Sequence, residues 1–212
     1  MMSKKEGIEM TLNPITTIIL VSPKGNAEDI FARIKIPYEV EYHHVAIDYP
    51  STTSPLDFTV YCSFVTLWRQ FMVERNKVYI STKRTVSIDG EIICPPTTRQ
   101  AAYRYLAKLS NRQHIVTTAI AVRYLGQVTM VVVESKVTMK KLSQKIIEYY
   151  VETGEPFEHD IGYNIQGLGA NITKSIEGDF DNVAGLPIDA LQEHLISKKI
   201  LVVKEGEIVD VY

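Results

Sequence analysis

The sequence has few of the residues and patterns that would assign it to several common classes of protein. Its two cysteines, Cys62 and Cys94, lie in apolar surroundings and outside any CxxC or Cys/His spacing. This usage indicates reduced, buried thiols and gives no zinc site. The formal net charge of -2 provides no basic field over the molecule, so nucleic-acid binding is not indicated.

Long apolar runs and enzyme signature motifs are missing as well. The apolar run at residues 15–21 is too short to cross a bilayer and does not resemble the core of a signal peptide. We therefore expect a cytoplasmic protein without membrane association. The chain contains no GxGxxG or Walker glycine pattern, no GxSxG and no HExxH, and its five histidines are scattered. The motifs alone therefore define no catalytic triad and no metal site.

What the chain does contain is a succession of helix and strand patterns. Its composition, 45% apolar and 23% charged, is typical of a globular protein. Apolar periodicity predicts strands at residues 15–22, 38–47, 77–82, 85–93, 114–124, 127–137 and 170–177. It predicts helices at residues 26–34, 54–74, 99–109, 142–152 and 187–198. This order indicates an α/β fold with a mixed sheet, and not the regular alternation of a Rossmann fold.

Residues 54–74 show the apolar period of a helix. Ser54 and Pro55 suit the cap and the first turn. Apolar residues then recur every three or four positions, at Phe58, Cys62, Val65, Trp68 and Met72. We interpret this stripe as the buried face of the helix, and Trp68 as a core residue.

The stretch 153–167, TGEPFEHDIGYNIQG, interrupts these regular elements. Gly154 can adopt a positive φ that ends the preceding helix, and Pro156 cannot continue one. Four polar residues lie within six positions, namely Glu155, Glu158, His159 and Asp160. Irregular backbone on a rigid framework is typical of ligand-binding loops, but a solvated acidic loop has the same composition. These residues alone leave both interpretations open.

The residues from 153 onward also carry a specific resemblance. Residues 154–156, GEP, are followed at fixed distances by Tyr163, Ile165-Gln166-Gly167, Ile176-Glu177-Gly178, Asn182-Val183 and Gly185-Leu186-Pro187. Matching residues upstream are Asp89-Gly90-Glu91-Ile92, Leu109-Ser110, His114, Val116 and Thr118. At this spacing residues 18–198 resemble the Maf family, the septum-formation-like nucleoside triphosphate pyrophosphatases related to inosine triphosphatase.

The resemblance implies a single Maf-like domain over residues 1–212. Its α/β fold would place an elongated mixed sheet in two lobes around a central nucleotide cleft, and such chains are often homodimers. We expect residues 1–14 to be poorly ordered and residues 200–212 to form a C-terminal hairpin. The implied reaction cleaves a nucleoside triphosphate between its α- and β-phosphates, with Mg²⁺ or Mn²⁺ held by acidic residues.

Several positions that carry chemistry in that family differ in this chain. The family's first loop, Ser-x-Ser-Pro-Arg-Arg, aligns with residues 22–27. These keep Ser22 and lose both arginines, so Lys24 alone remains to meet a phosphate. Asp48 stands one position beyond the family's acid, and Thr66 replaces a lysine.

The largest departure lies where the family carries its catalytic aspartate. Its Ala-Asp-Thr segment is Thr82-Lys83-Arg84 here, its Lys-Pro is Pro95-Pro96, and its Asp-Lys pair is Glu158-His159. One unit charge repels a divalent ion by roughly 8 kcal/mol at ~4 Å and an effective dielectric of ~20. With both cations at a strand terminus in the cleft, we expect no tight metal site there, although Lys83 and Arg84 can hold phosphates.

Three hypotheses follow from these substitutions. The main one is a non-catalytic or strongly impaired nucleotide-binding or interaction protein that needs no cofactor. The first alternative is an active pyrophosphatase with a rearranged site that uses Mg²⁺ or Mn²⁺, and the second is a structural subunit of a larger complex. The candidate catalytic acids are Glu158 and Asp48. The candidate substrate-binding residues are Ser22, Lys24, Lys83, Arg84, Glu155, His159 and Gln166.

Overall fold

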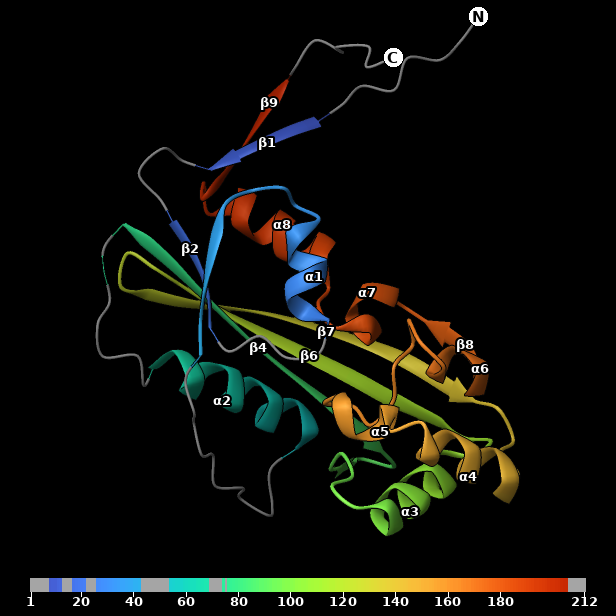
Figure 1. The fold of residues 1–212 in the computed structure, drawn as a ribbon. Helices are drawn as coiled ribbons and strands as arrows, with labels where there is room; N and C mark the ends of the chain where they lie inside the picture. The colour runs from blue at the N-terminus through green and yellow to red at the C-terminus, as the bar shows by residue number, and fades with distance from the viewer. Residues whose placement is uncertain are drawn as a thin grey trace, which may run out of the picture.

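The protein folds around a seven-stranded mixed sheet. The computed structural model describes residues 8–12, 17–21, 26–42, 54–68, 74 and 76–205. The strand order is β3-β2-β4-β6-β7-β8, and β5 pairs with β4. The strands are β2 (Thr17–Val21), β3 (Tyr38–Glu41), β4 (Lys77–Ile88), β5 (Glu91–Ile93), β6 (Gln113–Tyr124), β7 (Gln127–Met139) and β8 (Thr173–Glu177). The predicted α/β class and elongated mixed sheet are confirmed, because β4, β6 and β7 run the length of the molecule (Figure 1).

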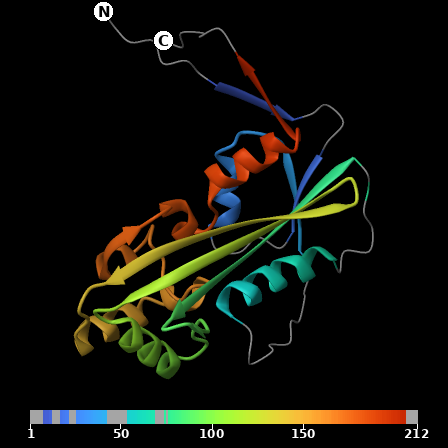
Figure 2. The same cartoon turned by 180° about the vertical axis from the view of Figure 1, so that it is seen from behind.

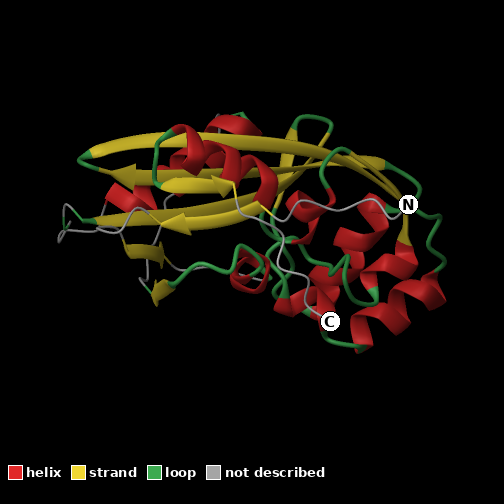
Figure 3. Ribbon diagram, turned by 90° about the horizontal axis from the view of Figure 1, so that it is seen from above, coloured by secondary structure: helices red, strands yellow, loops and turns green. Residues whose placement is uncertain are grey.

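Helices cover the sheet in groups. They are α1 (Ala27–Ala32), α2 (Pro55–Trp68), α3 (Arg99–Leu109), α4 (Gln144–Glu152), α5 (Glu155–Glu158), α6 (Gly169–Ile172), α7 (Phe180–Ala184) and α8 (Ile188–Ser197). Figures 1 and 2 show α2 on one side of the long strands and α1 with α8 on the other. The view from above in Figure 3 shows strands toward one end of the molecule and helices gathered at the other.

The side chains of β2 enter two separate cores. Ile18 and Leu20 belong to the main core, whereas Ile19 and Val21 pack with Leu67 of α2. Successive side chains of a strand point to opposite faces, so an uninterrupted apolar strand requires cover on both sides. The apolar run that predicted this buried strand therefore reflects its place between α1 and α2.

β4 is one continuous strand, where the sequence pattern predicted two. The predicted break at residues 83–84 is wrong, because β4 pairs with β6 without interruption from Tyr79 to Ser87. The expected hairpin is confirmed further on, where Asp89 and Gly90 have φ of 54° and 78° and connect β4 to β5. Lys83 and Arg84 therefore lie inside a strand, and their expected place at a strand terminus is wrong.

The buried face of α2 agrees with the predicted stripe at Phe58 and Cys62 and departs from it at Trp68. Trp68 is 63% exposed, and the interpretation of this residue as core is wrong. Thr59 and Ser63 are buried in its place because their hydroxyls have partners in β4: Thr59 Oγ1 lies 2.6 Å from Oγ1 of Thr85, and Ser63 Oγ donates to the carbonyl of Ser81 at 3.1 Å. These bonds remove the usual cost of burying a hydroxyl and rotate the helix away from its apolar stripe.

The described residues near the two ends of the chain pair with each other. β1 (Ile8–Leu12) and β9 (Leu201–Glu205) form a separate two-stranded antiparallel sheet. Part of the segment expected to be poorly ordered, 1–14, is thus a strand. The start of the expected hairpin, 200–212, pairs with β1, and residues 206–212 lie outside the described chain. No helix in the described ranges is both long and apolar enough to cross a membrane.

Candidate functional site

Lys83 and Arg84 point to opposite faces of the sheet. Ser81 and Thr85, two residues to either side of Lys83, bond to α2, which places Lys83 on the α2 face. Arg84 instead contacts the segment after α5 and the end of α7. The structure therefore does not bring the two cations together at one phosphate, as the sequence-based hypothesis required.

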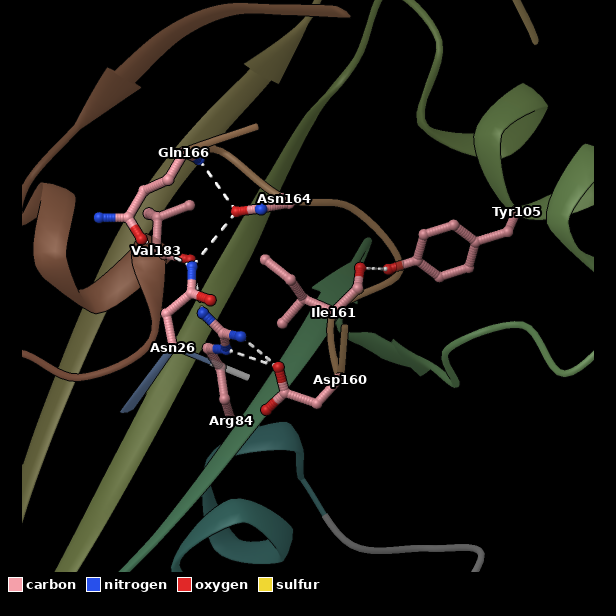
Figure 4. Close-up of polar contacts among 8 residues, drawn as sticks. All are labelled: Asn26, Arg84, Tyr105, Asp160, Ile161, Asn164, Gln166 and Val183. Carbon is pink, nitrogen blue, oxygen red and sulfur yellow. Dashed lines mark hydrogen bonds and ion pairs between the residues drawn. The ribbon is translucent and has the colours of Figure 1, made fainter. Parts of the chain in front are cut away.

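Arg84 is a buried cation with fixed partners. Its side chain is 3% exposed. Nε donates to Oδ1 of Asp160 at 3.1 Å, and Nη2 donates to the same oxygen. Nη1 donates to the carbonyl oxygen of Val183 at 2.6 Å, as Figure 4 shows. The guanidinium thus joins three segments of the chain, and its charge is matched by that of Asp160.

Lys83 keeps a half-buried place on the α2 side. Burial raises the pKa of the Cys62 thiol in α2, and the positive charge of Lys83 acts in the opposite direction, so the ammonium group lies within electrostatic range of that helix. Across the described chain no carboxylate forms an ion pair with Lys83. Of these two basic residues, Lys83 is the one without an ion pair to an acid of the described chain.

Residues 153–169 form an ordered loop that is held by Glu155. Gly154 has φ of 84°, so the predicted turn at this glycine is confirmed. One carboxylate oxygen of Glu155 accepts from the backbone N–H of Leu168 at 2.9 Å, and the other accepts from Gly169 at 2.9 Å and from the Tyr150 hydroxyl at 2.5 Å. Burial and this bond raise the pKa of Tyr150 far above its ordinary value, so the hydroxyl stays a donor. Glu155 therefore has structural partners on both oxygens.

The other acidic residues of this loop divide into two kinds. Asp160 is bound to Arg84, as described above. Glu158 is exposed and His159 half-buried, and within the described ranges neither side chain has a hydrogen bond or ion pair. Glu155 and Asp160 therefore stabilise the fold, and a ligand-binding role for Glu158 and His159 stays a prediction.

Three side-chain amides meet where α1 begins. Asn26 Nδ2 donates to Oε1 of Gln166 at 2.6 Å and to Oδ1 of Asn164 at 3.3 Å, and the Gln166 backbone N–H donates to the same Asn164 oxygen at 3.0 Å (Figure 4). Asn26 stands at the N-cap position of α1, but its side chain makes no capping bond and reaches across to the loop. Sequence reasoning identified Gln166 and missed Asn26 and Asn164, whose partners lie about 140 residues away in the chain.

α7 connects this amide cluster to Arg84. Its Val183 carbonyl accepts from Arg84, and Gly185 follows two residues later. A Cβ atom at Gly185 would lie 3.1 Å from the backbone nitrogen of Ala27 and 3.2 Å from the carbonyl carbon of Asn26. Such a contact is tighter than most, so a glycine favours this close approach of the start of α1 to the end of α7.

Other residues of the resemblance form buried polar contacts. His114 Nε2 lies 2.8 Å from the Tyr163 hydroxyl, with the two rings edge to face. Burial lowers the pKa of His114 to about 4, so the ring is neutral at pH 7. Asn182 Nδ2 donates to the Val116 carbonyl at 3.1 Å and to Ser135 Oγ at 2.9 Å. These residues join the sheet to the loops that cover it.

Part of the predicted site lies outside the described residues. These residues are Ser22, Lys24 and Asp48. Within the described ranges, no group of three or more His, Cys, Asp and Glu residues is placed to hold a metal ion. Beside Thr82, the hollow between β2 and the start of α1 has a volume of about 10 Å³, enough for one water molecule.

Comparisons with known proteins agree with this architecture. Residues 64–198 match the family model described as Maf-like protein. The chain is 35% identical over 181 residues to the dTTP/UTP pyrophosphatase of Dictyoglomus turgidum, covering 84% of this chain and 94% of the relative. It is 29% identical over 191 residues to the dTTP/UTP pyrophosphatase of Thermosipho africanus, covering 90% of this chain and 98% of the relative.

A third relative extends the same pattern. The dTTP/UTP pyrophosphatase of Caldanaerobacter subterraneus is 30% identical over 177 residues, which cover 82% of this chain and 85% of the relative. Both the family match and the near full-length relatives show that this chain belongs to the Maf-like protein family.

Proposed function

We propose that the protein acts on nucleoside triphosphates of the dTTP and UTP type, and that release of pyrophosphate is the reaction to test first. The observation that carries this proposal is the family membership, joined to relatives that bear the name dTTP/UTP pyrophosphatase over nearly their whole length. A shared fold does not by itself establish a shared reaction. The residues at the site must therefore be weighed separately.

The described residues offer binding groups for such a substrate. Lys83 offers a positive charge to a phosphate on the α2 face, whereas the exposed Gln166 amide beside Asn26 lies on the opposite face with Arg84, so the two are separate candidate contacts. Glu158 and Asp48 remain the candidate acids. Ser22, Lys24 and His159 remain candidate substrate-binding residues. In this proposal Glu155 and Arg84 shape the site through their structural bonds.

The family's chemistry implies a divalent cation, and the described residues do not by themselves provide its ligands. They contain no cluster of three acidic, histidine or cysteine side chains, and Asp160 is already bound to Arg84. We therefore derive no catalytic step through a metal. Dependence on Mg²⁺ or Mn²⁺, if turnover occurs, stays a prediction.

A second candidate function is nucleotide binding without turnover. It is favoured by Lys83, which stands where the resemblance places the family's catalytic aspartate and whose charge is not matched by a described acid. Arg84 adds no net repulsion, since Asp160 neutralises it. The names of the relatives favour the active enzyme, and the substitution at Lys83 favours the silent one. The two candidates predict different responses to the same substrate.

The deciding experiment measures pyrophosphate release from dTTP and UTP with Mg²⁺ or Mn²⁺, alongside the thermal stability of the protein with each nucleotide. Turnover by the wild type that Glu158→Gln abolishes establishes the pyrophosphatase. A rise in melting temperature without turnover establishes binding alone. Lys83→Asp, which leaves Arg84 and its bonds intact, should then gain activity by restoring an acid in β4. Absence of both turnover and any thermal response would favour a structural subunit.

A further inference from the structure

The orientation of the Gln166 side-chain amide follows from one backbone N–H group. The oxygen and the nitrogen of an amide have similar shapes, so the hydrogen bonds around it decide which of them faces a given partner. The backbone N–H of Gln166 can only donate, and it lies 3.0 Å from the side chain of Asn164. The atom that Asn164 presents there must therefore be its oxygen, Oδ1.

This assignment passes from Asn164 to Asn26 and then back to Gln166. The Asn26 side chain lies 3.3 Å from Asn164 Oδ1, so it must present its nitrogen Nδ2 to that oxygen. The same nitrogen lies 2.6 Å from the Gln166 side chain, which must then present its oxygen Oε1. Among the residues that the structure describes, no acceptor bonds to Gln166 Nε2. This nitrogen points away from Asn26 and Asn164 in Figure 4.

The two residues that orient Gln166 are themselves held by backbone hydrogen bonds. The Asn164 N–H donates at 3.2 Å to the hydroxyl of Tyr150, whose side chain is buried. The Asn26 carbonyl oxygen accepts from the N–H of Ile30 in α1 at 3.0 Å. A binding group with supports that are fixed in this way keeps its geometry when it meets a ligand.

We propose that Asn26 is a positioning residue that fixes Gln166 as a hydrogen-bond donor to an oxygen atom of the nucleotide. The inference rests on the proposed function. It adds a residue that the resemblance does not supply, because Asn26 lies in the loop where both arginines of the family are lost. A fixed donor can bond to a carbonyl or a phosphate oxygen, whereas an amino group in the same place would leave two donors facing each other.

The oxygen that Gln166 meets belongs either to the base or to a phosphate, and two nucleotides separate these cases. Uracil has a carbonyl oxygen where cytosine has an amino group, whereas the ribose and the triphosphate of UTP and CTP are the same. A contact to the base carbonyl should make UTP bind at least about tenfold more tightly than CTP. A contact to a phosphate should not distinguish them.

Two variants of nearly unchanged shape test the role of Asn26. In Asn26→Asp the new carboxylate can only accept, so Gln166 must turn its nitrogen toward it and present its oxygen to the ligand. Asn164→Asp adds the same charge but still accepts from the Gln166 N–H and from Asn26, so the orientation is retained. The dissociation constants of UTP, CTP and uridine are measured by titration calorimetry for the wild type and both variants, with EDTA present to prevent metal-dependent turnover.

The pattern of the three dissociation constants decides. A preference for UTP that Asn26→Asp abolishes and Asn164→Asp keeps would assign Gln166 to the base. If Asn26→Asp weakens UTP and CTP equally, by more than about fivefold beyond Asn164→Asp and without an effect on uridine, Gln166 contacts a phosphate. Equal effects of the two variants on every ligand would overturn the proposal. A wild type that binds no nucleotide would instead contradict the proposed function and, with it, this role of Gln166.

A measurement without ligand tests the orientation alone. NMR resolves the side-chain NH₂ groups of asparagine and glutamine, and hydrogen bonding within the fold slows their exchange with water. Slow exchange is expected for the NH₂ group of Asn26 and fast exchange for that of Gln166. The reverse order would overturn the proposal, whatever the nucleotides show.

Discussion

Arg84 and Lys83 are neighbouring cations on opposite faces of β4, and they differ in burial and in their bonding partners. On one face Arg84 is 3% exposed and is bound by Asp160 and Val183. On the other face Lys83 is half-buried and has no ion pair with any acid in the described chain. Two consecutive residues of β4 therefore differ: the charge of Arg84 is bound within the fold, and the charge of Lys83 has no ion pair in the described chain. In this protein, the type of residue alone does not distinguish the two roles.

The difference follows from what each side chain can bond. A buried charge is tolerated when hydrogen bonds satisfy it and an opposite charge lies close, and the planar guanidinium offers five donors to do so. The ammonium group of a lysine stays hydrated more easily where its side chain is only half-buried. On one face Arg84 thus joins β4 to the segment after α5 and to α7, and on the other Lys83 has no ion pair with an acid of the described chain.

The largest expected effect comes from breaking the Arg84 contacts. Arg84→Ala leaves Asp160 without its cation, and Asp160→Asn leaves a buried guanidinium without its anion. Each single change should reduce the free energy of unfolding by about 3–5 kcal/mol. The measurement is equilibrium denaturation in urea with the wild type alongside.

The double variant Arg84→Met, Asp160→Asn tests the cause of that loss. With both charges removed no unpaired ion is left, so a large part of the stability should return. Losses below about 1 kcal/mol in both single variants would show that the pair is not a structural anchor. Losses in the double variant equal to the sum of the single ones would point instead to packing around the two side chains.

A smaller effect is expected from pH on the same face as Arg84. The pKa of His114 falls from its ordinary value of 6.5 to about 4 because the ring is buried. In the unfolded chain the ring binds a proton below pH 6.5, so stability is complete above that pH and is lost progressively as the pH falls from 6.5 to 4. The loss reaches up to about 3 kcal/mol.

His114→Gln should flatten this part of the stability profile. The measurement is the difference in unfolding free energy between the variant and the wild type at several pH values, so that the titration of carboxylates common to both cancels. His194→Gln is the control, because the pKa of His194 is lowered in a less buried setting, in part by Lys198. A wild-type profile with the same slope as that of His114→Gln between pH 6.5 and 4 would exclude the buried ring as the cause.

Local patterns were sufficient for those parts of the fold that depend on neighbouring residues. The helix predicted at residues 99–109 matches α3, whose cap is formed by Thr98 Oγ1 accepting from the Ala101 N–H. The turn at Gly154 was predictable because it needs only a residue that readily adopts a positive φ. The exposure of Trp68 was not predictable in this way, because it depends on hydroxyl pairs between α2 and β4.

The candidate site was less accessible to sequence reasoning, for the same reason. Arg84 and Asp160 are 76 positions apart, and Asn26 and Gln166 are 140 apart. The local periodicity of apolar residues carries no information on pairs that lie so far apart in the sequence. The resemblance identified the segments that come together around Arg84. It assigned Arg84 and Glu155 to substrate binding, because it did not indicate the residues that bind them within the fold.

The smallest effect is expected on the other face of β4, at Lys83. The Lys83 ammonium group has no ion pair in the described chain and its side chain is half-buried. Because methionine retains the aliphatic stem, Lys83→Met should change the unfolding free energy by less than about 0.5 kcal/mol. The same denaturation series that contains Arg84→Ala provides the measurement. A loss as large as that of Arg84→Ala would remove the contrast between the two faces. A small loss in stability, together with a clear loss of nucleotide-induced stabilisation, would assign Lys83 to the ligand.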